Sequence, residues 1–368
     1  MIRVLHVVGA MYPGGLENFI MNLYEDIDRT KFQFDFVVHA RKEGDYGELI
    51  EAMGGRIFLL PRLTTHPFKN LRMLFRLVKD NRYRIVIRHT ANALVSPQLL
   101  VAKLAGAKTI CHSHNETDPS RVLHCLGRLL LPVATDDYIA CSPKAGAWMY
   151  GKRPFTVIKN AIHLDKFAYS KAKADKVDEE FSIKGKHVYG HIANFIASKN
   201  HMFLIDVFKE ILLLDNDAVF FCLGEGELRQ SIEEKIRENN LENQVILTGI
   251  RKDVENFMSR MDVLVFPSFF EGLPLTLIEA QASSLPMIIS DTITKDVVVT
   301  EGLVNWGNIN ASPKEWAQVA VRLMHQDFDR TKCQEKSISQ AGYNMKELVS
   351  YYENYYESLV CNGEDGCD

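Results

Sequence analysis

Two glutamates with seven residues between them, Glu271 and Glu279, flank a turn that could hold a phosphate group. The backbone amides of Gly272, Leu273 and Thr276 would point out of the start of a helix, and free amides at a helix N-terminus bind anions. Carboxylates do not bind phosphate, because both groups are negatively charged. They suit hydroxyl groups on either side of it, such as those of a sugar and of a ribose.

Residues 261–292 must position this turn. The apolar run 262–267 ends at a proline, which predicts a short buried strand. Pro274 suits the first position of the following helix, where its missing N–H costs nothing. The helix continues over residues 275–283, and residues 287–290 form a second strand. In a helix, the two glutamates would lie about 12 Å apart on roughly the same side.

Spacing alone leaves a plainer alternative, in which both glutamates are surface acids favoured by the helix dipole. The surrounding sequence, P-S-F-F-E-G-L-P-L-T-L-I-E-A-Q-A, is more specific. It resembles the E-x7-E signature of the retaining glycosyltransferases of family 4, which have the GT-B fold. The resemblance implies that Glu271 holds hydroxyls of a donor sugar and that Glu279 holds the ribose of its nucleotide. The backbone at Gly272, Leu273 and Thr276 would then hold the diphosphate.

A second glycine loop follows the strand predicted at residues 2–9. Strand, glycine loop and helix form a phosphate-binding layout, and Asp35 stands where a dinucleotide site has its ribose-binding acid. The spacing is not G-x-G-x-x-G, however, so we set NAD aside. The loop resembles the N-terminal glycine loop of family 4, which implies that Gly15 contacts the donor and Gly14 the acceptor. The alternative is a tight turn that requires positive φ.

Short apolar strands alternate with helical segments along the chain, which predicts parallel, doubly wound sheets. With the resemblance, this predicts an α/β protein of the GT-B class, whose two Rossmann-like domains face each other across a cleft. We expect an acceptor-side domain over residues 1–167 and a linker over 168–185. A nucleotide-sugar-binding domain follows over 186–340. A C-terminal helix with a frayed tail, 341–368, would return to the first domain.

Two histidines lie where a predicted strand of the first domain runs into a loop, in H-S-H-N. His112 and His114 could be a pair of metal ligands. No cysteine or acidic group nearby completes a set, so we expect no metal. In the resembling family a histidine at the end of this strand lines the active site near the donor sugar. The resemblance thus implies a catalytic role for His114. His112 is the second choice for that role and is assigned to the acceptor side.

The loop after the strand predicted at residues 186–192 departs from the family pattern. Family members usually carry an arginine there and a lysine five residues later, and both neutralise the donor diphosphate. Lys199 matches the lysine, but Asn194 stands where arginine is expected, and Arg251 is a candidate substitute for it. Glu225, in G-E-G-E-L, lies in a segment that resembles the family's glycine turn beside the nucleotide.

Composition favours a cytosolic protein with real hydrophobic cores. The chain has 368 residues, 46% of them hydrophobic. No apolar run reaches the roughly 18 residues of a membrane span, and the N-terminus does not read as a signal peptide. Seven scattered cysteines fit a reducing compartment better than a disulfide framework.

Charge is unevenly distributed. Residues 1–165 carry 22 Lys/Arg against 15 Asp/Glu, a net charge of +7, whereas the rest carries 21 against 32, a net charge of −11. A basic first half favours an anionic partner such as membrane lipid or a polyprenyl diphosphate. Residues 68–79 and 121–133 could lie on a membrane, although such segments are more often packing helices. Alternatively, the uneven distribution of charge arises by chance and indicates no partner.

The resemblance to family 4 implies a retaining glycosyltransferase that needs no metal or other cofactor. Its donor would be a nucleotide-sugar, preferably a UDP-sugar, and its acceptor a lipid-linked glycan of bacterial capsular or exopolysaccharide synthesis. It would act in the cytoplasm at the anionic inner face of the membrane, without nucleic acid. Two alternatives stay open: a non-catalytic or weakly active binding protein, for which Asn194 argues, and a GT-B nucleotide-sugar epimerase.

Overall fold

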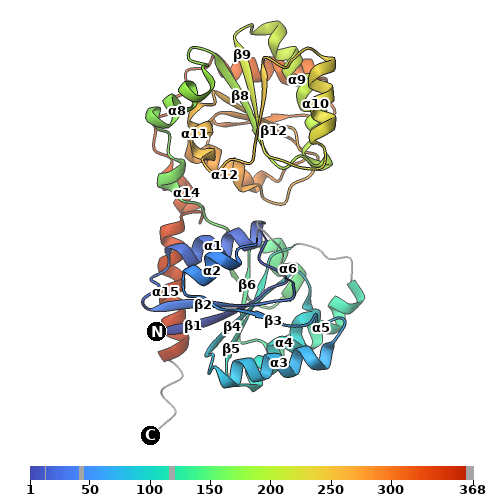
Figure 1. Ribbon diagram of the computed structural model, residues 1–368, viewed down its shortest axis with the longest axis vertical. Coiled ribbons are helices and arrows are strands. Elements are labelled where there is room, and N and C mark those ends of the chain that lie inside the picture. Colours follow the sequence, from blue (N-terminus) through green and yellow to red (C-terminus); the bar gives the residue numbers. More distant parts are fainter. Residues whose placement is uncertain (13, 41–44, 116–120, 362–368) are drawn as a thin grey trace. The chain divides into compact units, whose positions relative to one another are not determined.

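The computed structural model describes residues 1–12, 14–40, 45–115 and 121–361 (Figure 1). By its contacts the chain divides into two compact units. The first comprises Met1–Ala161 with Met345–Asp368, and the second comprises Ile162–Asn344. Each unit has its own parallel sheet with helices on both faces, which is the doubly wound arrangement that the alternating pattern predicts.

The first unit has a seven-stranded sheet among its described residues, in the order β3-β2-β1-β4-β5-β6-β7. Its strands are β1 (Ile2–Val7), β2 (Phe32–Val38), β3 (Ile57–Leu59), β4 (Ile85–Thr90), β5 (Lys108–Ser113), β6 (Asp137–Ala140) and β7 (Thr156–Val157). Its helices are α1 (Gly15–Asp26), α2 (Gly47–Ala52), α3 (Pro67–Asp80), η1 (Ala93–Val95), α4 (Ser96–Leu104), α5 (Arg121–Ala134), α6 (Pro143–Tyr150) and α15 (Met345–Cys361).

The two faces of this sheet are covered by different helices (Figure 1). Helices α1, α2 and α15 pack on one face over a core rich in aromatic side chains. Helices α3, α4, α5 and α6 cover the other face. From α15, Tyr352 and Tyr356 are buried against Phe19 and Phe32, so the last helix is part of this core. The tail predicted to fray lies outside the described residues from 362 onward.

The second unit has a six-stranded sheet among the described residues, in the order β10-β9-β8-β11-β12-β13. Its strands are β8 (His187–Ile192), β9 (Ala218–Leu223), β10 (Val245–Gly249), β11 (Val263–Phe266), β12 (Met287–Ser290) and β13 (Val304–Gly307). Its helices are α7 (Leu164–Phe167), α8 (Lys171–Phe181), η2 (Ala197–Lys199), α9 (His201–Leu214), α10 (Arg229–Glu238), α11 (Val254–Arg260), α12 (Leu275–Ala282), η3 (Lys295–Val297), α13 (Pro313–Met324) and α14 (Glu335–Gln340).

The stretch 168–185 is not the linker that the sequence predicts, because most of it forms α8 inside the second unit. Val177 and Ile183 are buried in one of this unit's cores, and Asp178 accepts a hydrogen bond from Arg260 at 2.5 Å. Helix α8 has only a narrow apolar stripe among many charged residues, so its composition resembles that of a linker.

The strand order of each sheet determines where the loops with the candidate site residues lie. In each sheet the strand order reverses next to the first strand, between β1 and β4 and between β8 and β11. Ligands of such sheets bind outside the carboxyl ends of the strands at this switch point. The loop after β1 leads to Gly14 and Gly15, and the histidines lie at the carboxyl ends of β4 and β5. The loops after β8 and β11 hold Lys199 and Glu271. No described helix is long and apolar enough to cross a membrane.

Candidate active site

The turn between β11 and α12 carries the first glutamate. β11 ends at Phe266 and α12 begins at Leu275. Pro274 is the N-cap of α12, with φ −74° and ψ 110°, which is extended backbone. The prediction that Pro274 is the first helical residue was therefore wrong by one position. A proline side chain has no oxygen with which to cap the amides at the helix start, so they are left for another acceptor.

The backbone amides of Gly272, Leu273 and Thr276 have no hydrogen-bond acceptor among the described residues. Gly272 is exposed, and a Cβ added there would meet no atom within 4 Å. Its φ is not positive. The fold itself therefore does not require glycine at this position, whereas a ligand that approaches the backbone closely would.

Lys199 and Glu271 form an ion pair beside these amides. Lys199 Nζ donates to Glu271 Oε1 at 2.5 Å, and the two side chains are 17% and 9% exposed. The loops that carry them are tied together, because Phe269 N donates to Ser198 O at 2.8 Å. Two residues predicted to contact different parts of a donor are thus partners of each other in this structure.

Glu279 lies in α12 and is partly buried. Desolvation raises its pKa to about 7, nearby Glu255 adds to the shift, and Lys166 opposes it. Both the protonated and the ionised forms of Glu279 are therefore populated at neutral pH. Such a carboxyl group can either accept or donate a hydrogen bond to a hydroxyl.

Asn194 is exposed in the loop after β8. This loop packs on the glycine turn, since Phe195 N donates to Glu225 O at 2.8 Å. A Cβ at Gly226 would lie 2.5 Å from Phe195 O, so glycine is required there for the close approach of two backbones. The Glu225 side chain accepts a hydrogen bond from Arg229.

Arg251, the candidate substitute for the missing arginine, forms ion pairs with two acidic side chains. Its guanidinium donates to Asp253 at 2.9 Å and to both carboxylate oxygens of Glu180, at 2.8 and 2.9 Å. The hydrogen bonds that Arg251 donates to Asp253 and then to Glu180 raise its pKa. Glu180 belongs to α8, so the misread linker is also the reason that Arg251 is engaged.

In the first unit, α1 begins at Gly15 with Gly14 as its N-cap. Gly14 has φ −167°, and Gly15 has no positive φ either, so the tight-turn explanation for these glycines is wrong. A Cβ at Gly15 would meet nothing within 4 Å, and one at Gly14 would lie 2.7 Å from Glu17 Oε2. No side chain caps the helix. The Glu17 carboxylate lies over this helix start and interacts with its own backbone amide, so an anion would have to displace it.

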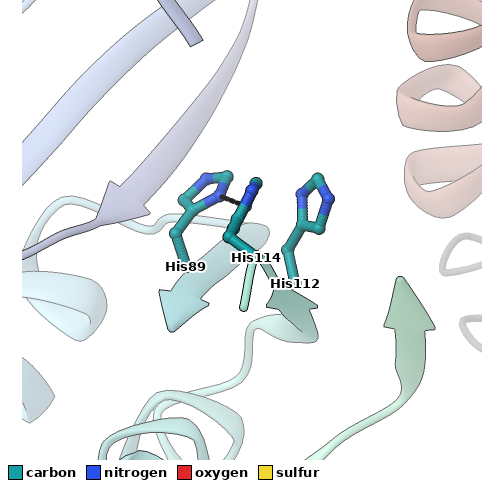
Figure 2. Close-up of side chains that lie close together, drawn as sticks. All are labelled: His89, His112 and His114. Carbon is teal, nitrogen blue, oxygen red and sulfur yellow. Dashed lines mark hydrogen bonds between the residues drawn. The ribbon is translucent and has the colours of Figure 1, made fainter. Parts of the chain in front are cut away.

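His112 and His114 lie at the end of β5, and the structure brings His89 of β4 beside them (Figure 2). One ring nitrogen from each of the three histidines can be chosen so that all three atoms lie within 4.8 Å of one another. His89 Nδ1 and His114 Nε2 are hydrogen-bonded at 3.0 Å, and His89 Nε2 bonds His6 Nδ1 at 3.0 Å. His112 is fully buried, and neither of its nitrogens has a hydrogen-bond partner among the described residues.

Burial keeps these imidazoles neutral. Desolvation lowers the pKa of His114 to about 3 and that of His6 to about 3. It also lowers the pKa of His89 and of His112 well below the ordinary value, and repulsion among the clustered rings adds to the effect. Neutral imidazoles present lone pairs, as hydrogen-bond acceptors or metal ligands do.

Two family models match the chain. Residues 13–166 match Glycosyltransferase Family 4, and residues 186–326 match Glycosyl transferases group 1. EpsF of Bacillus subtilis (strain 168), which carries the name of a glycosyltransferase, is 32% identical over 373 residues, 96% of this chain and 96% of EpsF. The chain belongs to glycosyltransferase family 4.

Another relative of this glycosyltransferase is the Escherichia coli UDP-Gal:alpha-D-GlcNAc-diphosphoundecaprenol alpha-1,3-galactosyltransferase, 24% identical over 98% of each chain. Among solved structures, Anabaena HepE has a TM-score of 0.78 at 16% identity and covers 97% of this chain and 100% of its own. A glycosyltransferase from Rickettsia africae ESF-5 has a TM-score of 0.79 at 16% identity, over 98% of each chain. The likeness shows the GT-B fold.

Sequence reasoning missed two residues of this glycosyltransferase. His89 lies 23 positions before His112, and the only local signal was its place at the end of a predicted strand. His6 lies in the first strand and looked like an ordinary core position. Asp35, by contrast, has a structural role, because it accepts hydrogen bonds from Arg3, Arg56 and Tyr83. That is consistent with setting aside a ribose-binding role for it.

Proposed function

We propose that this glycosyltransferase moves a sugar from a nucleotide-sugar to a lipid-linked glycan, with retention at the anomeric carbon, in bacterial capsular or exopolysaccharide synthesis. The observation that carries the proposal is the Lys199–Glu271 pair beside the unpaired amides of the turn. A cation, an acid and anion-binding backbone in one pair of loops match the charged and hydroxyl-rich parts of such a donor.

In this proposal each group has a separate role. As the bond to the sugar breaks, negative charge grows on the leaving diphosphate, and the Lys199 ammonium and the start of α12 stabilise it. Glu271, released from Lys199, accepts hydrogen bonds from sugar hydroxyls and orients the ring. Glu279 holds the ribose, and His114 lines the donor-sugar side. No side chain is assigned as a nucleophile, so retention requires the acceptor hydroxyl to attack on the face from which the diphosphate departs. The new glycosidic bond forms as the bond to the diphosphate breaks, and the departing phosphate oxygen takes the proton of the hydroxyl.

The names of relatives support a UDP-sugar and a lipid-linked acceptor. The name of the Escherichia coli relative specifies UDP-Gal and a diphosphoundecaprenol-linked acceptor. HepE has been solved with UDP and with UDP-glucose. We extend both features to this chain as part of the proposal.

The proposal includes catalysis without a metal ion. The positive charge for the diphosphate would come from Lys199 and from the helix dipole of α12. The exposed Asn194 contributes no charge, and Arg251 is paired elsewhere. The chain therefore has one cation fewer than the family pattern, which favours a slow enzyme as the second candidate function.

A face of the first unit fits peripheral contact with an anionic membrane, which completes the proposal. Helix α3 packs on α4, and α4 packs on α5 (Figure 1). The exposed fractions of four apolar side chains in one stripe of α5 are 60–78%, and Phe68 of α3 is 87% exposed. The stripe consists of Val122, Leu126, Leu129 and Val133. The exposed Lys69, Arg72, Arg76 and Lys79 of α3 supply cations of the kind that anionic lipid headgroups bind.

The test is a transfer assay with the purified chain, labelled UDP-, GDP- and ADP-sugars, and a polyprenyl-diphosphate-linked sugar as acceptor, with EDTA present. We expect transfer from a UDP-sugar, and less than about 1% of it in Glu271→Gln, since the lost interactions are strongest in the transition state. Glu242→Gln, on an exposed loop, is the matched control. Full transfer by Glu271→Gln contradicts the assigned role. A changed sugar on the nucleotide without acceptor indicates an epimerase, and binding without UDP release indicates a binding protein.

A further inference from the structure

Three imidazoles from two neighbouring strands converge at the carboxyl end of the first sheet (Figure 2). His89 and His112 are direct register partners in the β4–β5 pair, and His114 follows two residues after His112. Phe19 of α1 covers them, with its ring centroid 5.6 Å from that of His112 and 6.0 Å from that of His114. The metal pair considered from the sequence lacked a third ligand, and the fold supplies it in His89.

We propose that His89, His112 and His114 form a binding site for one divalent transition-metal ion of the Zn²⁺ class. Imidazole nitrogen is a preferred ligand for zinc, copper, nickel and iron, whereas Mg²⁺ and Ca²⁺ prefer oxygen. Three histidines leave a fourth position for water or another ligand. Nothing in the catalytic proposal uses this ion.

The spacing of the three rings fits such an ion. Two nitrogens bound to one tetrahedral Zn²⁺ at about 2.0–2.1 Å each lie about 3.3–3.4 Å apart. The pair His89 Nδ1 and His114 Nε2 is already 3.0 Å apart, and all three ligand atoms lie within 4.8 Å. When the ion binds, nitrogen atoms as far apart as 4.8 Å must approach to about 3.4 Å.

His112 supplies an independent observation. It is 0% exposed, and neither ring nitrogen finds a hydrogen-bond partner among the described residues. A buried polar group without a partner costs free energy, so such groups normally have a structural or functional explanation. A lone pair directed at a metal ion satisfies one of the two nitrogens.

His6 fixes the orientation of His89. If the His89 Nε2–H donates to His6 Nδ1, at 3.0 Å, then His89 Nδ1 keeps its lone pair on the side of His114. Metal-binding histidines usually donate their second ring N–H to an acceptor in this way. His114 is partly exposed, unlike His89 and His112, so it marks the side from which an ion can enter.

The ion would act as an inhibitor of transfer. It occupies the lone pair of His114, the residue assigned to the donor-sugar side. This consequence rests on the proposed function, whereas the metal site itself does not.

Binding is tested on the whole chain, stripped with EDTA and dialysed, without donor or acceptor. Co²⁺ is titrated as a spectroscopic probe, then displaced with Zn²⁺, and bound Zn²⁺ is counted by mass spectrometry. We expect one ion per chain and visible ligand-field absorption. His112→Gln and His89→Gln should each weaken Zn²⁺ binding by more than about 100-fold. Removing a residue that only hydrogen-bonds a metal ligand lowers metal affinity by about 10- to 100-fold, and removing a ligand itself should lower it further.

His66→Gln, an exposed histidine of the same unit, is the matched control and should bind as the parent does. His114→Gln, at the partly exposed edge, keeps the test valid if a core variant misfolds, and circular dichroism reports folding. Unchanged binding in folded His114→Gln and His112→Gln overturns the site, because the ion is then held elsewhere. If Zn²⁺ binds as expected but does not slow transfer, the site stands and the assigned role of His114 fails.

Discussion

Replacing Lys199 with methionine removes the charge of the ion pair but keeps most of the side-chain length. In the parent chain Lys199 Nζ lies 2.5 Å from Glu271 Oε1 and 6.0 Å from the centre of the Phe266 ring. The aliphatic part of methionine can keep the contact with Phe266. The change therefore isolates the ammonium group.

Two magnitudes follow from this geometry. In the free protein, Glu271 is 9% exposed and would lose the one hydrogen-bond partner that it has among the described residues, which should cost about 1–3 kcal/mol of folding stability. In the transition state, losing one preorganised charge should cost about 3–4 kcal/mol, or about 10²–10³ in kcat. The free energy lost from the transition state should thus exceed the free energy lost from folding.

The assay is a double-mutant cycle of Lys199→Met and Glu271→Gln, read by urea unfolding and by transfer rate. Because the two groups bond each other only in the free protein, their stability effects should be non-additive by about 1 kcal/mol. Their effects on kcat should be closer to additive, since the donor separates them. A Lys199→Met variant that retains transfer within about threefold of the parent would refute the reasoning.

The remaining predictions concern four other positions. Asn194→Arg should raise kcat by about tenfold or more by restoring the missing cation, and an unchanged rate in steady-state kinetics would show that the diphosphate lies elsewhere. Gly272→Val should leave the melting temperature within a few degrees but weaken UDP binding in calorimetry, because a Cβ meets only open space in the chain. Donor affinity should rise with pH through about 7 as Glu279 ionises and accepts ribose hydrogen bonds, and Glu279→Gln should flatten that profile. Asp35→Asn should lower the free energy of unfolding in urea by about 3–5 kcal/mol at pH 7. Burial alone would raise the pKa of Asp35, but the hydrogen bonds from Arg56, Tyr83 and Arg3 lower it overall. The stability that Asp35 contributes should therefore be lost only as the pH falls below about 4.

The parts of the site that lie close in the sequence were predictable. Glu271, Gly272 and Glu279 belong to one strand–turn–helix unit, so local patterns sufficed to place them at the carboxyl end of a strand. The fold class was predictable for a similar reason, because alternation of strands and helices admits few parallel arrangements.

The parts that failed depend on contacts between distant segments. Arg251 looked available because its partner Glu180 lies 71 positions earlier, in a helix too charged to be recognised. His89 was missed because only the pairing of β4 with β5 brings it to His112. The ion pair of Lys199 with Glu271 likewise joins residues 72 positions apart. No local pattern reports such neighbours.

The position of α15 has a consequence for synthesis of the chain on the ribosome. The first unit consists of Met1–Ala161 and Met345–Asp368, and Tyr352 and Tyr356 fill its core. The second unit is a continuous segment, Ile162–Asn344, inserted between these two parts. Domains generally fold in the order in which they are made. Here the second unit has all of its residues first, and the first unit, although begun earlier, completes its core only when the last helix leaves the ribosome.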